Sequence, residues 1–215
     1  MPRLNLTRRQ FLTQMALGAG TAVTAVSLGG CDDDVSVSFD HGVASGDALS
    51  ERVILWTRAT PSKAADLEIT WEIALDADFR SLVGKGEFST GAARDYTVKV
   101  DAGGLLPGQR YYYRFRHGDV SSEIGRTRTL PVGGVDEVKL GVFSCPNYPA
   151  GHFHVYAEAA KRDDLFAVVH LGDYIYEYGP GEYATADAEA LGRVPVPAHE
   201  TVSLEDYRLR YAQYR

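Results

Sequence analysis

Residues 168–176, which read VVHLGDYIY, decide the fold together with residues 142–145, VFSC. Each stretch begins as a continuous apolar run of strand length, the pattern typical of a buried parallel strand. Asp173 and Cys145 follow these runs, and we expect their side chains to meet the Tyr176 phenol at one edge of a sheet. Thiolate and phenolate suit a hard, highly charged ion such as Fe(III), and a carboxylate can bridge to a second cation. The sequence therefore predicts a metal site at this edge.

The pattern around these runs predicts a βαβ unit, with strands at 138–143 and 165–171 and a helix at 151–163 between them. Such a unit gives a parallel sheet with a right-handed crossover, and sites in these sheets lie at the carboxyl ends of the strands. Two strands do not close a core of this type. We therefore expect the sequence to be the N-terminal part of a longer protein.

The last part of the chain has two features. Residues 179–202 show no periodicity, which indicates either a functional lid or a disordered segment. Ser203 and Asp206 then form a capping-box pattern that predicts a helix. Its expected apolar stripe consists of Leu204, Tyr207, Tyr211 and Tyr214.

Residues 35–131 have the pattern of a small all-β domain. Short runs of alternating apolar and polar residues predict strands at 52–57, 67–73, 96–100 and 110–115, and strands at this spacing make a sandwich. The domain is rich in aromatic residues, and aromatic residues at strand spacing favour a core position over a carbohydrate- or peptide-binding surface. The polar segment 40–47, which includes His41 and Asp47, is interpreted as a turn or bulged edge rather than a ligand site.

Composition excludes one class of partner. The 215 residues are 45% hydrophobic and 24% charged, which suffices for one or two cores, and the formal net charge is -7. No Lys/Arg cluster follows the N-terminus, so nucleic acid is excluded as a partner because phosphate binding needs a basic face. Cys31 and Cys145 are the two cysteines, and their contexts argue against a disulfide framework.

Residues 1–30 are interpreted as a targeting segment. Arg8 and Arg9 precede a short apolar stretch, as in a signal for the Tat export machinery. Residues 28–31, LGGC, resemble the bacterial lipoprotein cleavage box, which implies lipidation of Cys31 and anchoring to a membrane. The expected location is the periplasm or the cell envelope.

Four separated motifs together resemble the PhoD-like alkaline phosphatases of the metallophosphoesterase superfamily. They are residues 39–47 (FDHGVASGD), 143–148 (FSCPNY), 151–156 (GHFHVY) and 170–177 (HLGDYIYE). The segment before Tyr111 also resembles the tyrosine corner of fibronectin type III domains. The resemblance implies an α+β protein of two domains: a fibronectin III-like β-sandwich at 35–131, then the start of an α/β metallophosphoesterase domain at 137–215, incomplete at its C-terminal side.

The implied activity is hydrolysis of phosphomonoesters or phosphodiesters outside the cytoplasm with Fe(III) and Ca(II), through a metal-activated hydroxide. By position, Cys145, Asp173 and Tyr176 would be metal ligands, and Asp173 would bridge the two cations that hold the nucleophile. Asn147 would line the phosphate pocket. The family's later ligand segments are absent, so we expect residues 1–215 alone to be inactive or nearly so.

Plainer interpretations remain for several residues and for the whole chain. His152 and His154 are expected at the surface or behind the ligands, and His170 is expected to be a core histidine with a hydrogen-bond partner. The competing function is a non-enzymatic surface lipoprotein whose β-sandwich binds a partner. A nucleotide-binding α/β protein is disfavoured, because no glycine-rich phosphate loop follows the first strand of the α/β part.

Overall fold

The computed structural model describes residues 35–215. The predicted signal segment at 1–30 and the predicted lipidation site Cys31 lie outside these residues. The first part of the described chain is built from strands, with one 3-10 helix, η1 (Ala92–Arg94). The strands are β1 (Val37–Ser38), β2 (Val43–Gly46), β3 (Arg52–Arg58), β4 (Thr60–Pro61), β5 (Leu67–Ala74), β6 (Leu82–Thr90), β7 (Thr97–Gly103), β8 (Arg110–His117), β9 (Val120–Ser121) and β10 (Gly125–Arg128).

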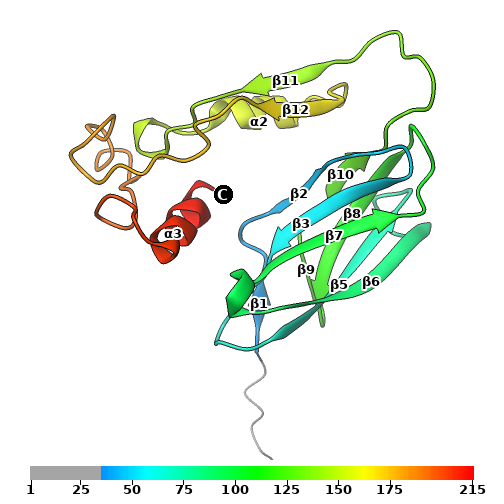
Figure 1. The fold of residues 1–215 in the computed structure, drawn as a ribbon, viewed down its shortest axis with the longest axis horizontal. Coiled ribbons are helices and arrows are strands. Elements are labelled where there is room, and N and C mark those ends of the chain that lie inside the picture. Colours follow the sequence, from blue (N-terminus) through cyan, green and yellow to red (C-terminus); the bar gives the residue numbers. More distant parts are fainter. Residues whose placement is uncertain (1–34) are drawn as a thin grey trace, which may run out of the picture. The chain divides into compact units, whose positions relative to one another are not determined.

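These strands form two antiparallel sheets. One sheet has the order β2-β3-β7, and the other has the order β10-β8-β5-β6 with β9 paired to β8 (Figure 1). β1 and β4 make a separate two-stranded ribbon. The β-sandwich that the sequence predicts is therefore confirmed.

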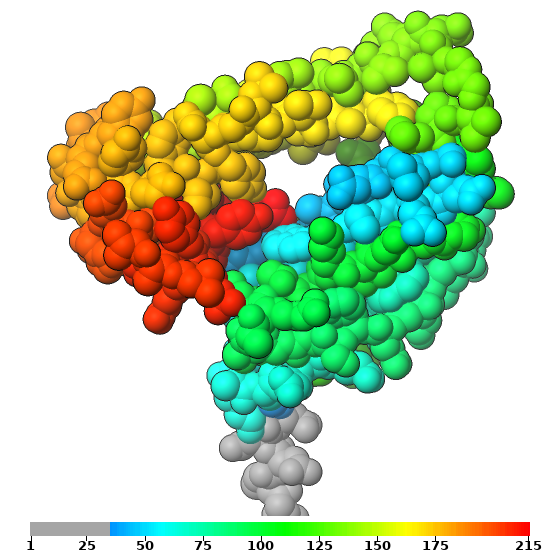
Figure 2. All heavy atoms as spheres, viewed as in Figure 1, coloured from blue at the N-terminus to red at the C-terminus, as the bar shows by residue number. Residues whose placement is uncertain are grey.

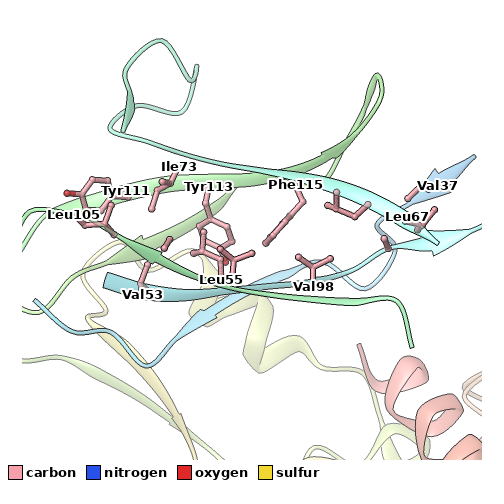
Figure 3. Close-up of a cluster of buried hydrophobic side chains, with 14 residues drawn as sticks. Val37, Val53, Leu55, Leu67, Ile73, Val98, Leu105, Tyr111, Tyr113 and Phe115 are labelled. Atoms are coloured by element: carbon pink, nitrogen blue, oxygen red, sulfur yellow. The ribbon is translucent and has the colours of Figure 1, made fainter. Parts of the chain in front are cut away.

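The core lies between the two sheets, where alternate side chains of each strand point inward. Figure 3 shows Leu55 of β3 and Val98 of β7 facing Tyr113 and Phe115 of β8. All four are at most 2% exposed. The rings of Tyr111, Tyr113 and Phe115 thus belong to the core, as predicted, rather than to a binding surface.

A tyrosine corner closes the loop before β8. The Leu106 amide donates to the Tyr111 hydroxyl at 2.7 Å. The Leu106 carbonyl accepts from the Thr129 hydroxyl at 2.6 Å. The phenol of Tyr111 therefore satisfies a backbone amide upstream of its own strand, as the sequence predicts.

The polar segment 40–47 forms a turn followed by an edge strand. Gly42, with φ +65°, donates its amide to the Phe39 carbonyl at 3.2 Å, and β2 then pairs with β3. The interpretation of this segment as a turn and sheet edge is confirmed.

The second part contains the predicted parallel pair. β11 (Leu140–Phe143) and β12 (Ala167–His170) are parallel, and α2 (His154–Ala160) lies between them in sequence. All three elements are shorter than predicted. The 3-10 helix η2 (Tyr148–Ala150) and an extended Gly151 precede α2, so the helix begins only after Phe153.

The expectation that both strands are buried is wrong for the described part of the chain. Val142 is 56% exposed, Val168 60% and Leu171 70%. A parallel strand is buried only when both faces of its sheet are covered. Within residues 35–215 the sheet has two strands and α2 is its crossover helix, so much of its apolar surface stays open.

The chain ends in α3 (Leu204–Tyr214), and residues 179–202 before it contain turns without a helix or strand. The predicted capping box is present, because the Asp206 amide donates to Ser203 Oγ at 3.2 Å and the Ser203 amide donates to Asp206 Oδ2 at 2.9 Å. In Figure 2 the red atoms of α3 lie against the orange atoms of the preceding segment.

The predicted apolar stripe of α3 needs a correction. Tyr214 is buried, but Leu204 is 67% exposed and the most deeply buried residue of the helix is Arg210. Among residues 35–215, no helix has the length and apolar character needed to cross a membrane.

Candidate metal centre

The loops that follow β11 and β12 are held side by side by backbone hydrogen bonds. The Leu171 amide donates to the Phe143 carbonyl at 2.8 Å, and the Cys145 amide donates to the Gly172 carbonyl at 3.1 Å. These bonds extend the parallel pairing past its last register pair, Phe143 and His170. The carboxyl ends of the two strands therefore deliver Cys145 and Asp173 to the same place, as predicted from the sequence.

One carboxylate oxygen lies between the thiol and the phenol. The Cys145 Sγ is 3.5 Å from Asp173 Oδ2, and the Tyr176 hydroxyl donates to the same oxygen at 3.3 Å. Cys145 and Asp173 are exposed, and Tyr176 is half-buried. The structure thus brings all three predicted ligands together on an accessible edge of the sheet.

The backbone at this edge is strained. Cys145 has φ +59° and Asp173 has φ +50°, and both belong to a small group of described non-glycine residues with positive φ. Side chains make this conformation unfavourable, and such strain is concentrated at functional sites. The two ligand-bearing loops therefore share an uncommon geometry that aims their side chains at one point.

The electrostatics of the cluster favour a cation. Partial removal from water, and after that the neighbouring Cys145 and Asp173, raise the pKa of the Tyr176 phenol well above its ordinary value of 10.0. Three oxygen and sulfur groups that can each become anionic repel one another unless a positive charge lies among them. A cation bound among these groups would offset that repulsion.

The phenol is needed to complete the set. Within residues 35–215, no three His, Cys, Asp or Glu side chains gather closely enough to hold a metal ion. Cys145 and Asp173 supply two donors and Tyr176 supplies the third. The rings of Tyr178 and Tyr183 stack on the Tyr176 ring, with centroids 6.3 Å and 5.9 Å away, and support its position.

The hydrogen-bond partner predicted for His170 is present, but the residue lies on the open two-stranded sheet and not in a core. His170 is half-buried, and its Nε2 lies 3.3 Å from the Tyr156 hydroxyl. Its ring also packs edge-to-face on Tyr174. His152 and His154 are exposed and lie with ring centroids 5.7 Å apart, which agrees with the surface position predicted for them.

Asn147 lines a cavity of about 270 Å³ next to Cys145. Its Oδ1 accepts from the Tyr214 hydroxyl at 3.3 Å. Its Nδ2 is shielded from solvent and has no hydrogen-bond partner in the described part of the chain. The amide therefore has a free donor beside the candidate site.

Arg193 was not singled out from the sequence, yet it joins the segment 179–202 to the Cys145 loop. Its Nε donates to the Tyr148 carbonyl at 2.7 Å. Its guanidinium also lies 3.6 Å from the centroid of the Tyr148 ring and 4.8 Å from that of Phe153. An arginine between prolines and glycines carries no periodic signal, so the sequence pattern could not reveal this contact.

Comparisons with known proteins agree along most of the chain. Residues 26–131 match the family model described as the N-terminal domain of PhoD-like phosphatases, and residues 140–215 match the one described as PhoD-like phosphatase. The chain belongs to the PhoD-like phosphatases. It is 39% identical over 211 residues to alkaline phosphatase D of Bacillus subtilis (strain 168), an alignment that covers 94% of this chain and 35% of that protein.

A solved structure titled "Structure of PhoD" shares the fold of this PhoD-like chain. The TM-score is 0.75 at 40% sequence identity, over 82% of this chain and 35% of that one. The chain therefore spans about a third of the length of the relatives it matches. The family assignment that the four sequence motifs predicted is confirmed.

Proposed function

We propose that this PhoD-like protein is a metal-dependent phosphoester hydrolase whose candidate centre consists of Cys145, Asp173 and Tyr176. Cys145, Asp173 and Tyr176 would hold the first proposed cation, Fe(III), and Asp173 would also bind the second, Ca(II). One observation carries the proposal: a single carboxylate oxygen lies 3.5 Å from a thiol and 3.3 Å from a phenol at the carboxyl ends of two parallel strands. The similarity to alkaline phosphatase D supports it.

The chemistry divides between the cations and the side chains. When bound, the cations would supply positive charge that acidifies a water molecule and neutralises the phosphoryl oxygens. Cys145 and Tyr176 would bind as anions, and the remaining oxygen of Asp173 is available for the second cation. Because Asp173 and Cys145 are exposed, a phosphoester can approach this edge directly.

Asn147 is the residue we assign to the substrate. Asn147 borders the cavity next to Cys145, and its Nδ2, which is shielded from solvent, is a hydrogen-bond donor without a partner in residues 35–215. A phosphoryl oxygen would supply the missing acceptor if the Asn147 side chain turned its Nδ2 toward the cavity. The proposed substrates are phosphomonoesters or phosphodiesters, and the net charge of -7 argues against long nucleic acids.

The domain arrangement and location belong to the same proposal. Residues 1–30 would direct Tat-dependent export, 35–131 would form the sandwich domain and 137–215 would begin the metallophosphoesterase domain. A lipid on Cys31 would anchor the protein at the membrane of the cell envelope. Labelled fatty acid should enter the wild type and not the Cys31→Ala variant, and equal labelling of both would contradict the lipid anchor.

The hydrolase proposal is tested on the whole protein that the gene encodes, supplied with Fe(III) and Ca(II). Phenolate bound to ferric iron absorbs visible light, so the protein should be coloured and Tyr176→Phe should bleach or shift the band. Tyr183→Phe, which removes the same atom from a neighbouring ring, should leave the band in place. Asp173→Asn should abolish turnover of a chromogenic phosphoester. A colourless protein that contains only zinc and is fully active would contradict the iron assignment.

A further inference from the structure

We propose that Arg210 is a positioning residue that fixes the backbone of the Tyr176 loop, and thereby the direction of the phenol toward Asp173. The inference rests on the proposed metal centre for its functional meaning. Its structural basis is independent of any metal, because it follows from the hydrogen bonds of one buried guanidinium.

Arg210 is only 1% exposed and is the largest fully buried side chain of residues 35–215. Its Nε donates to the Val196 carbonyl at 2.7 Å and its Nη2 to the Pro197 carbonyl at 3.1 Å. Its Nη1 donates to the carbonyls of Tyr176 and Tyr178, the latter at 3.0 Å. One side chain of α3 thus binds two loops that lie about twenty residues apart in sequence.

The chemistry of these bonds explains why an arginine is present. Burial lowers the pKa of Arg210, because the cation is removed from water, and all four acceptors are backbone carbonyls rather than carboxylates. A buried cation is costly, and an apolar residue of similar volume is often no less stabilising. A planar guanidinium offers five donors in fixed directions, which a compact ammonium lacks. The arginine is therefore best explained by the loop geometry that it imposes.

That geometry bears directly on the candidate centre. Tyr176 lies three residues after Asp173, and its phenol reaches the Asp173 carboxylate at 3.3 Å. Because the Tyr176 carbonyl is hydrogen-bonded to Arg210, the peptide group that follows Tyr176 has a fixed orientation. This limits the directions in which the Tyr176 side chain can point. Groups behind the ligands that set their orientation are typically worth about 10- to 100-fold in metal affinity or activity.

The same helix also reaches the other ligand-bearing loop. The Tyr214 hydroxyl donates to Asn147 Oδ1 at 3.3 Å, two residues after Cys145. The Tyr207 hydroxyl donates to Glu177 Oε1 at 3.4 Å, next to Tyr176. α3 therefore contacts both loops of the candidate centre. Arg210 donates two of these hydrogen bonds, and Tyr207 and Tyr214 donate one each.

The test compares Arg210→Lys with Arg208→Lys in the whole protein that the gene encodes. Both changes keep the charge, but Arg208 is only half-buried and donates to the Ala93 carbonyl at 3.2 Å instead of to these loops. We expect Arg210→Lys to lower ferric-ion affinity by about 10- to 100-fold and to shift the visible phenolate band. Arg208→Lys should change neither. If Arg210 only stabilised the fold, the folded Arg210→Lys protein would keep the ferric-ion affinity and the visible phenolate band of the wild type. That result would overturn the inference.

A second measurement needs no metal. In the metal-free protein, amide hydrogen exchange at residues 174–179, Val196 and Ala198 should be faster in Arg210→Lys than in the wild type, and unchanged exchange there would overturn the inference. If Arg210→Lys loses α3, methylguanidinium added to Arg210→Ala should restore slow exchange in both loops, and a failure to restore it would also overturn the inference. A wild type that binds no ferric ion would reject the proposed function, while the exchange data would still decide what Arg210 does.

Discussion

Removal of one hydroxyl group from the tyrosine corner should weaken the sandwich by a predictable amount. In Tyr111→Phe the ring stays, and because Tyr111 is 1% exposed its apolar packing is retained. The Leu106 amide loses its acceptor at 2.7 Å. The Leu106 carbonyl keeps the Thr129 hydroxyl at 2.6 Å, and the phenol's own contact to that carbonyl is a marginal 3.5 Å. One effective hydrogen bond is lost, which costs about 1 kcal/mol of unfolding free energy.

The assay is chemical unfolding of the whole chain followed by tryptophan fluorescence. Both tryptophans, Trp56 in β3 and Trp71 in β5, belong to the sandwich, so the signal reports on this part of the protein. The matched control is Tyr112→Phe, which removes the same atom from the outward-facing neighbour. For a domain of this size the loss in Tyr111→Phe corresponds to about 4–8 °C in melting temperature. Equal stability of the Tyr111→Phe and Tyr112→Phe variants would refute the reasoning.

Two further predictions concern packing and pH. Gly125→Ala should destabilise the sandwich, because the new Cβ would lie 2.2 Å from Cζ of the buried Tyr113 ring; Gly103→Ala, with nothing within 4 Å, should leave the fluorescence-monitored stability nearly unchanged. In α3, bonds from the Ser203 amide and hydroxyl lower the pKa of Asp206 from 3.8 to about 2. Because the folded pKa is the lower one, this stabilisation is complete above about pH 4 and is lost as the pH falls through about 2. The NMR signals of α3 should show this loss, and a Ser203→Ala variant should show weaker helix signals at pH 5; a helix insensitive to both changes would contradict the capping box.

Period-two alternation made most of the sandwich predictable. In β8, residues 111, 113 and 115 are buried while their neighbours are more exposed. The sequence shows the same pattern, because an aromatic residue stands at each of these alternate positions. The boundaries in the second part were less predictable. The helix expected from 151 starts only at His154, because Gly151 is extended and follows a 3-10 turn that contains Pro149. Backbone geometry of this kind leaves no periodic signal.

The candidate centre was predictable because two strand ends place their next residues at one edge. That reasoning found Cys145, Asp173 and Tyr176, but it gave no indication of Arg210. Charged residues on a helix are expected to face solvent, and this one is buried. Its spacing contained a usable signal, since Arg210 lies three residues after Tyr207 and four before Tyr214, on the same face. Only the carbonyls that converge on that face show why a cation occupies it.

X-ray absorption spectroscopy at the iron edge tests the central claim most directly, because it identifies the atoms bound to the metal. The protein is loaded with Fe(III) in a Cys31→Ala background, so that Cys145 is the one remaining cysteine within residues 1–215. We predict one sulfur scatterer in the first coordination sphere, and its replacement by oxygen in Cys145→Ser. A first sphere of only oxygen and nitrogen atoms before the Cys145→Ser change would contradict the proposed centre.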